Sequence, residues 1–201
     1  MNYSEIKATT LAYIDRADDF ALENLLDNFL KIVEARVNIK LRTQNMSTRA
    51  TITTTTDEYY GLPADFAAFR EVKKISGSTK TALEYATPHS FDGLVPLSTE
   101  VHFFTIEANQ LRIRPIAASV DLEIVYYKKV PALTSSATTN WITDSYPLVY
   151  IFGLLVECCA YTKDTEAAAL WEQRFRDAMD ELTVADSQDR WSGAPLIVRT
   201  E

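Results

Sequence analysis

The hydrophobic periodicity of the chain changes twice, and these changes constrain the fold more than any other feature. Residues 1–50 and 134–186 place apolar side chains three and four positions apart, which is the spacing of one buried helical face. Residues 51–133 instead contain β-branched runs and alternating apolar and polar residues, which are typical of half-buried strands. We therefore predict an α+β protein. Its N- and C-terminal helices (1–50 and 134–186) form a bundle, into which an antiparallel β-domain (51–133) is inserted.

The strongest helical signal follows Asp18 and Asp19, which are both good helix caps. Its apolar stripe consists of Leu22, Leu26, Phe29, Leu30, Val33 and Val37. This spacing predicts an amphipathic helix of about 22 residues that ends near Arg42. A shorter helix, with Ser4 as its expected cap, precedes it.

Helical periodicity returns after a polar linker at 134–139. Asp144 is the expected cap of a helix that has Pro147 in its first turn and runs to about Tyr161. Asp164 is the expected cap of the last helix, whose apolar seam requires a partner helix.

Two segments rich in aromatic residues bracket the predicted β-domain: Tyr59–Phe66 and Tyr126–Leu133. Pro63 fixes its own φ and disfavours helical geometry at Leu62, so the first segment should leave a strand and turn. Pro131 cannot donate to a ladder, so it should end the second strand. Strands are predicted at 51–56, 69–75, 81–85, 101–107, 111–114 and 120–129, with a hairpin turn at 108–110 and a helical turn at 87–92.

Residues 187–201 lack periodicity, although they contain Trp191 and the apolar triplet Leu196, Ile197 and Val198. We predict an extended C-terminal tail. It could fold back on its own core, or it could add to another subunit or partner as an extended segment, which is a recurrent recognition mode. The sequence favours the partner reading.

Motifs for catalysis or for cofactor binding are not evident in the sequence. Cys158 and Cys159 are the only cysteines; as neighbours they form neither a disulfide framework nor the spaced pair of a zinc turn. His89 and His102 are the only histidines, and His102 lies beside two phenylalanines. No Gly-x-Ser-x-Gly elbow occurs, and five glycines provide no phosphate-binding loop. We predict no catalytic, cofactor-binding or metal site.

Paired carboxylates could serve glycan hydrolysis, which requires only two of them in a cleft. The pairs Asp57 with Glu58, Asp164 with Glu166, and Asp180 with Glu181 have the pattern of helix caps and solvated charges. Glu157 differs, since it lies within an apolar helix, where an ionised carboxylate is costly unless paired. It is interpreted either as the partner of an arginine such as Arg36 or Arg174, or as a catalytic acid.

The formal charge of −8 argues against a nucleic-acid grip, because duplex binding depends on Lys and Arg neutralising phosphates. The apolar run Tyr146–Tyr161 contains Pro147, Gly153 and Glu157 and is shorter than a membrane span, so a buried core helix is predicted. The start of the chain lacks the pattern of a signal peptide, and the cysteine usage fits reduced cytosolic folding.

Contact residues are predicted on the β-domain. Arg112 and Arg114 alternate with apolar residues and so share one strand face, which suits either an interface with acidic neighbours or a solvated sheet surface. Tyrosines can serve either the core or a contact surface. The residues predicted for a subunit or tail interface are Tyr60, Leu62, Asp65, Arg112, Arg114 and Tyr127.

The chain resembles the head-to-tail adaptor (connector) proteins of tailed bacteriophages. The resemblance rests on the order of several motifs: the opening helices with Arg42, Tyr60–Phe66, Tyr85–Pro88, Leu111–Pro115, Tyr126–Leu133, Asn140-Trp141, Tyr146-Pro147 and the helix around Trp171. It implies a ring, commonly of twelve copies, beneath the portal at the capsid vertex. The tails reach the portal, tail or nozzle proteins bind the opposite side, and DNA passes through the channel only as cargo.

The leading hypothesis is therefore a structural virion protein that is assembled in the host cytoplasm, performs no reaction, uses no cofactor and binds no membrane. The portal-binding tail is assigned to Trp191, Leu196, Ile197 and Val198. Two alternatives remain. One is a virion-associated hydrolase of cell-wall peptidoglycan that uses acidic residues, and the other is a generic bacterial interaction domain.

Overall fold

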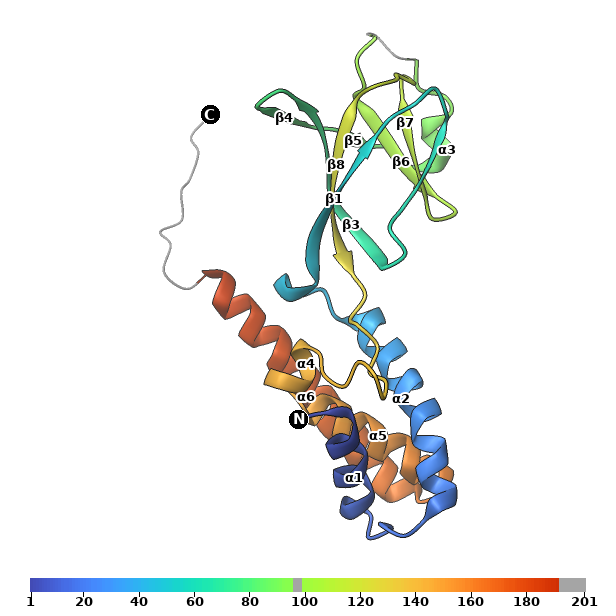
Figure 1. The fold of residues 1–201 in the computed structure, drawn as a ribbon, viewed down its shortest axis with the longest axis vertical. Helices are drawn as coiled ribbons and strands as arrows, with labels where there is room; N and C mark the ends of the chain where they lie inside the picture. The colour runs from blue at the N-terminus through green and yellow to red at the C-terminus, as the bar shows by residue number, and fades with distance from the viewer. Residues whose placement is uncertain (96–98, 192–201) are drawn as a thin grey trace. The chain divides into compact units, whose positions relative to one another are not determined.

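The computed structural model describes residues 1–95 and 99–191 of the chain (Figure 1). They divide into two compact units. The helical unit contains Met1–Asn45 and the described part of Val130–Glu201, and the β unit is Met46–Lys129. The α+β class with largely antiparallel sheets is confirmed. The β unit starts before the predicted residue 51, because its first strand begins at Ser47, ahead of the threonine run.

The helical unit is organised around one apolar helix. Its helices are α1 (Tyr3–Tyr13), α2 (Phe20–Lys40), α4 (Trp141–Ser145), α5 (Leu148–Tyr161) and α6 (Thr165–Trp191). Helix α5 packs against α1, α2 and α6, and most of its side chains are buried. Gly153 makes this close packing possible, because a Cβ there would lie 2.6 Å from Cγ1 of Val33 and 3.2 Å from Cε2 of Phe175.

The helix N-termini follow the predictions only in part. Asp19 caps α2 as predicted, accepting the Leu22 N–H at 3.0 Å, and Asp164 accepts the Ala167 N–H at 3.0 Å at the start of α6. The prediction of Ser4 as the first cap is wrong. Asn2 caps α1 in a capping box with Glu5, because its amide oxygen reaches the backbone N–H one turn ahead.

The prediction that Asp144 caps a helix containing Pro147 is also wrong. Asn140 caps the short helix α4 through the Ile142 and Thr143 N–H groups, and Asp144 lies inside that helix. Pro147 then occupies the N-cap position of α5. The helix is divided here because Pro147 has no N–H to continue the ladder from α4.

The predicted tail begins too early. Residues 187–191 are the final residues of helix α6, which ends at Trp191. Asp186 accepts the Gln44 N–H at 2.6 Å, and Arg190 pairs with Asp186 at 2.6 Å and donates to the Arg42 carbonyl at 3.2 Å. These polar contacts tie the end of the helix to the segment that follows α2. Leu196, Ile197 and Val198 lie outside the described residues.

Two four-stranded sheets make up the β unit, in the orders β1-β8-β3-β4 and β2-β7-β6-β5. The strands are β1 (Ser47–Thr53), β2 (Tyr59–Gly61), β3 (Phe66–Ser76), β4 (Thr79–Ala82), β5 (Glu84–Tyr85), β6 (Phe103–Glu107), β7 (Gln110–Arg114) and β8 (Asp121–Lys128). One pairing departs from the predicted antiparallel arrangement, since β5 runs parallel to β6. A short 3₁₀ helix (Gln44–Met46) precedes β1, and α3 (Pro88–Phe91) follows β5.

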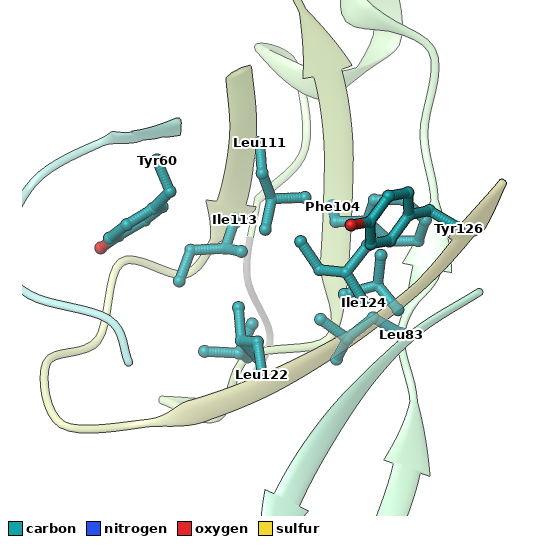
Figure 2. Close-up of a cluster of buried hydrophobic side chains, with 10 residues drawn as sticks. Tyr60, Leu83, Phe104, Leu111, Ile113, Leu122, Ile124 and Tyr126 are labelled. Carbon is teal, nitrogen blue, oxygen red and sulfur yellow. The ribbon is translucent and has the colours of Figure 1, made fainter. Parts of the chain in front are cut away.

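The core of the β unit is formed by side chains from both sheets (Figure 2). Leu122, Ile124 and Tyr126 alternate along β8 with the period of two that the sequence predicted, and Leu111 and Ile113 do the same on β7. The predicted hairpin is confirmed: Ala108 and Asn109 connect β6 to β7, both with positive φ. Two adjacent positive φ values match the twist of a two-residue hairpin.

Within the described residues, no helix combines the length and the hydropathy that crossing a membrane requires.

Candidate interaction surfaces

The two aromatic segments that bracket the β-domain are joined by Asp65. Its carboxylate accepts a hydrogen bond from the Tyr126 hydroxyl at 2.9 Å, and its backbone carbonyl accepts the Lys129 N–H at 2.7 Å. The turn itself is closed by the Phe66 N–H, which donates to the Pro63 carbonyl at 3.0 Å. Burial and the neighbouring Asp65 raise the pKa of Tyr126 to about 12. Asp65 therefore holds the turn of the first segment against the strand of the second.

Tyr60 and Leu62 are core residues of the β unit. The Tyr60 ring is buried, and its hydroxyl donates to the Asp57 carbonyl at 2.7 Å while accepting the Thr55 N–H at 3.2 Å. Leu62 is half-buried and packs against the same core. Tyr127 is half-buried, and the Arg70 guanidinium lies 5.4 Å from its ring centre. The assignment of these residues to an interface stays a prediction. A partner protein could contact chiefly the outer atoms of Tyr127 and Asp65, because Tyr60 and Leu62 belong to the core.

Arg112 forms the centre of an acidic cluster. Its side chain is 7% exposed, and its guanidinium pairs with Glu58, with Asp92 at 3.0 Å and with Glu107 at 3.2 Å. The same group lies 5.0 Å from the Tyr59 ring centre and 5.1 Å from that of Phe91. Burial alone would lower the pKa of Arg112, but the hydrogen bonds to Glu58 and Asp92 raise it above its ordinary value.

Arg114 satisfies the backbone of the loop that follows α3. Its Nη1 atom donates to the carbonyls of Phe91 at 2.8 Å, Asp92 at 3.0 Å and Leu94 at 3.0 Å. We refer to Arg112 and Arg114, with these partners, as the arginine clamp. The predicted acidic neighbours of Arg112 exist, but they come from the same chain, so the clamp fixes the α3 loop within the β unit.

Glu157 is engaged in an ion pair of the helical unit. Its carboxylate lies 3.5 Å from Arg36, as one of the sequence interpretations predicted, and Arg36 also pairs with Glu172 at 2.6 Å. The Arg36 guanidinium stacks 4.6 Å from the Phe175 ring centre. Arg174, the other predicted partner, lies over Trp171 instead. Burial opposes ionisation of Glu172, but its arginine neighbours lower its pKa below the ordinary value.

The remaining chemically active groups lie apart from one another. His89 is in α3, while Cys158 and Cys159 are buried free thiols of α5. Burial raises the pKa of Cys158 to about 12, which keeps this thiol protonated. No group of three or more metal-ligating side chains occurs in the described part of the chain.

Sequence reasoning missed one feature of the helical unit. Ile32 and Ile39 are exposed on α2, on a face different from the predicted buried stripe. Their spacing of seven residues, continued by Leu25, is a signal in the sequence that could have revealed this second face.

The described residues thus form a helical unit and a β unit in which the conspicuous polar side chains clamp a loop and pair helices. The chain belongs to the SU10 adaptor protein family, whose model matches residues 1–199. The predicted resemblance to phage head-to-tail adaptors is thereby confirmed, and membership implies a structural virion component at the portal region that associates with portal and tail proteins. No curated protein matches the chain.

Proposed function

We propose that this chain is a head-to-tail adaptor that assembles into a ring, of twelve copies, beneath the portal. The ring links the portal to tail or nozzle proteins, and DNA passes through its channel. The protein performs no reaction and uses no cofactor. The observation that carries the proposal is the match of the SU10 adaptor family along residues 1–199, which spans both units.

The charge of the chain supports this role. A net charge of −8 is unsuited to retaining phosphates, so a channel lined by such subunits would let DNA slide. The arginine clamp also supports the adaptor role. It fixes the α3 loop through internal contacts, so that the loop offers a preformed surface to a partner protein. Preformed surfaces bind with a lower ordering cost.

The first experiment tests assembly at the portal. Purified full-length protein, alone and mixed with its portal, is imaged by negative-stain electron microscopy, and copy number is measured by native mass spectrometry. Annular particles with portal attached are expected. Monomers that persist at high concentration and ignore the portal would contradict the proposal.

The second experiment tests portal binding by the C-terminal segment. Truncation after Trp191 removes Leu196, Ile197 and Val198 while leaving helix α6 complete. We expect weaker co-sedimentation with the portal and an unchanged far-UV circular dichroism spectrum. The triple substitution L196S/I197S/V198S removes the apolar side chains but keeps the length of the chain. It therefore distinguishes a loss of apolar contacts from the effect of a shorter chain. Unchanged attachment of both variants would refute the assignment.

A third experiment addresses the β unit. Substituting Tyr127→Ser and Asp65→Asn changes the outer atoms of the predicted interface, whereas Tyr60 and Leu62 serve the core. We expect intact folding with weaker binding of tail or nozzle proteins. Normal binding of tail or nozzle proteins by both variants would show that Tyr127 and Asp65 contact only residues of their own chain.

A further inference from the structure

Two buried polar atoms of the β unit belong to residues that face each other across neighbouring strands. Thr105 of β6 is the register partner of Arg112 of β7 in the antiparallel pair, so the two side chains lie on the same face of the sheet. Both residues are buried. Among the described residues, neither Oγ1 of Thr105 nor Nε of Arg112 has a hydrogen-bond partner.

This face of the sheet is covered by its neighbours. It is opposite to the face of Leu111, which points into the core (Figure 2). Helix α3 packs against β6, and the ring centre of Phe91 lies 5.1 Å from the guanidinium carbon of Arg112. Tyr59 of β2 is the other register partner of Arg112, and its ring centre lies 5.0 Å from the same carbon. Thr105 and Arg112 therefore meet beneath the arginine clamp.

The carboxylates of the clamp bind only the outer end of the guanidinium. The Nη2 atom of Arg112 pairs with Glu58 and, at 3.0 Å, with Asp92. Its Nη1 atom pairs with Glu107 at 3.2 Å. The Nε–H group is also a donor, and a buried donor of a charged group is costly to leave unpaired. The Thr105 hydroxyl can both donate and accept, so the two unpaired groups can be joined by a small molecule that does the same.

We infer that one water molecule is bound beneath the arginine clamp and bridges Nε of Arg112 to Oγ1 of Thr105. The water accepts the Nε–H and forms a second hydrogen bond with the hydroxyl. Directly opposed residues have Cβ atoms about 4.5 to 5.5 Å apart, so a water fits between the two groups and a larger ligand does not. Buried waters ordinarily satisfy polar groups that the protein leaves unpaired. The site lies within the β unit, and the inference does not depend on the proposed ring.

A high-resolution crystal structure of the full chain tests the site directly. We expect a peak of electron density about 2.7 to 3.2 Å from both Nε of Arg112 and Oγ1 of Thr105. A map in which the side chains of the clamp are well ordered, and in which no peak contacts these two atoms, would overturn the inference.

Two substitutions of Thr105 test the energetic role of the water. Thr105→Val keeps nearly the same shape but removes the hydroxyl, so the water loses a partner, and the amides of β6 and β7 should exchange with deuterium roughly fivefold faster. Thr105→Ser is the matched control, because it keeps the hydroxyl and loses only a methyl group. We expect slower exchange in the serine variant than in the valine variant.

An unpaired hydroxyl without a water predicts the opposite order. Replacing such a group with an apolar one is neutral or stabilising, so Thr105→Val would then exchange no faster than the wild type and more slowly than Thr105→Ser. That order would overturn the inference, since it would show that the hydroxyl of Thr105 contributes nothing to stability.

A double-mutant cycle tests whether the bridge includes Arg112. In the background of Arg112→Met, which removes the Nε–H donor, Thr105→Val should no longer accelerate exchange in β6 and β7. Equal acceleration in both backgrounds would show that the hydroxyl acts without Arg112, and would overturn the bridge. Where Arg112→Met does not fold, the electron density and the comparison of valine with serine decide. None of these results bears on assembly at the portal, so each can fail while the adaptor ring stands.

Discussion

The two units stabilise their folds by different means. In the helical unit, the arrangement depends on apolar packing around α5 and on the close approach at Gly153, and side chains such as Glu34 and Asp186 accept the backbone N–H groups of Leu133 and Gln44. In the β unit, loop carbonyls such as those of Phe91 and Leu94 have no ladder partner and are satisfied by Arg114. We therefore expect the helical unit to be most sensitive to a change of side-chain volume in its core, and the β unit to the loss of Arg112 or Arg114.

The largest effect is expected from Gly153→Val. The new side chain collides with Val33, which is fully buried and branched, so overpacking should cost about 3 kcal/mol. Hydrogen exchange followed by mass spectrometry should show the loss in α2, α5 and α6, with the β unit unchanged. The exposed Ala160→Val on the same helix is the control. Equal loss in both units would mean that they unfold together and would weaken the comparison.

The second-largest effect is expected from Arg112→Met, which should destabilise the β unit. Losing a buried ion pair costs roughly 3 to 5 kcal/mol, but these carboxylates are partly exposed and rehydrate, so about 2 kcal/mol is expected. Faster exchange should be confined to β7 and the α3 loop. Arg70→Met removes an exposed arginine of the same unit and should have little effect. A variant as stable as the wild type would show that apolar packing alone holds this unit.

Tyr126→Phe should cost about 1 kcal/mol, since it removes one hydrogen bond to Asp65. The raised pKa of Tyr126, about 12, favours the neutral phenol in the folded state. Its contribution is therefore present below the unfolded pKa near 10 and is lost as the pH rises towards 12. Burial also raises the pKa values of Tyr150 and Tyr3, so the late component of the phenolate absorbance should be smaller in the variant than in the wild type, not absent. A late component of unchanged size would contradict this assignment.

Glu34→Gln should have the smallest effect, with the opposite sign. Burial raises the pKa of Glu34, although its carboxylate accepts the Leu133 N–H at 2.7 Å. The folded state thus favours the protonated acid, and this stabilisation is lost as the pH rises through the folded pKa. Glutamine keeps the acceptor without the charge, so a gain of less than about 1 kcal/mol is expected near pH 7. The difference in Tm should shrink near pH 4; a constant difference would exclude titration as its cause.

The alternation in β8 and the stripe of α2 were predictable, because the period of apolar residues directly determines which side chains face a core. The positions of Asp19 and Asp164 as caps were also visible, since a cap bonds to N–H groups two or three residues away. Asn2 and Asn140 were missed because several polar residues stand near those helix starts, and only the backbone geometry selects one. The continuation of α6 through Trp191 was missed because its polar residues gain their contacts from the segment after α2.

The sequence by itself determined the class of the fold, the alternation of helical and β segments and the adaptor family. These properties depend on local periodicity or on motif order along the chain. Only the tertiary structure decided that Arg112 and Arg114 serve a clamp, that Tyr60 belongs to the core and that α2 has a second exposed seam. Those outcomes depend on side chains distant in sequence, which the fold alone brings within contact distance.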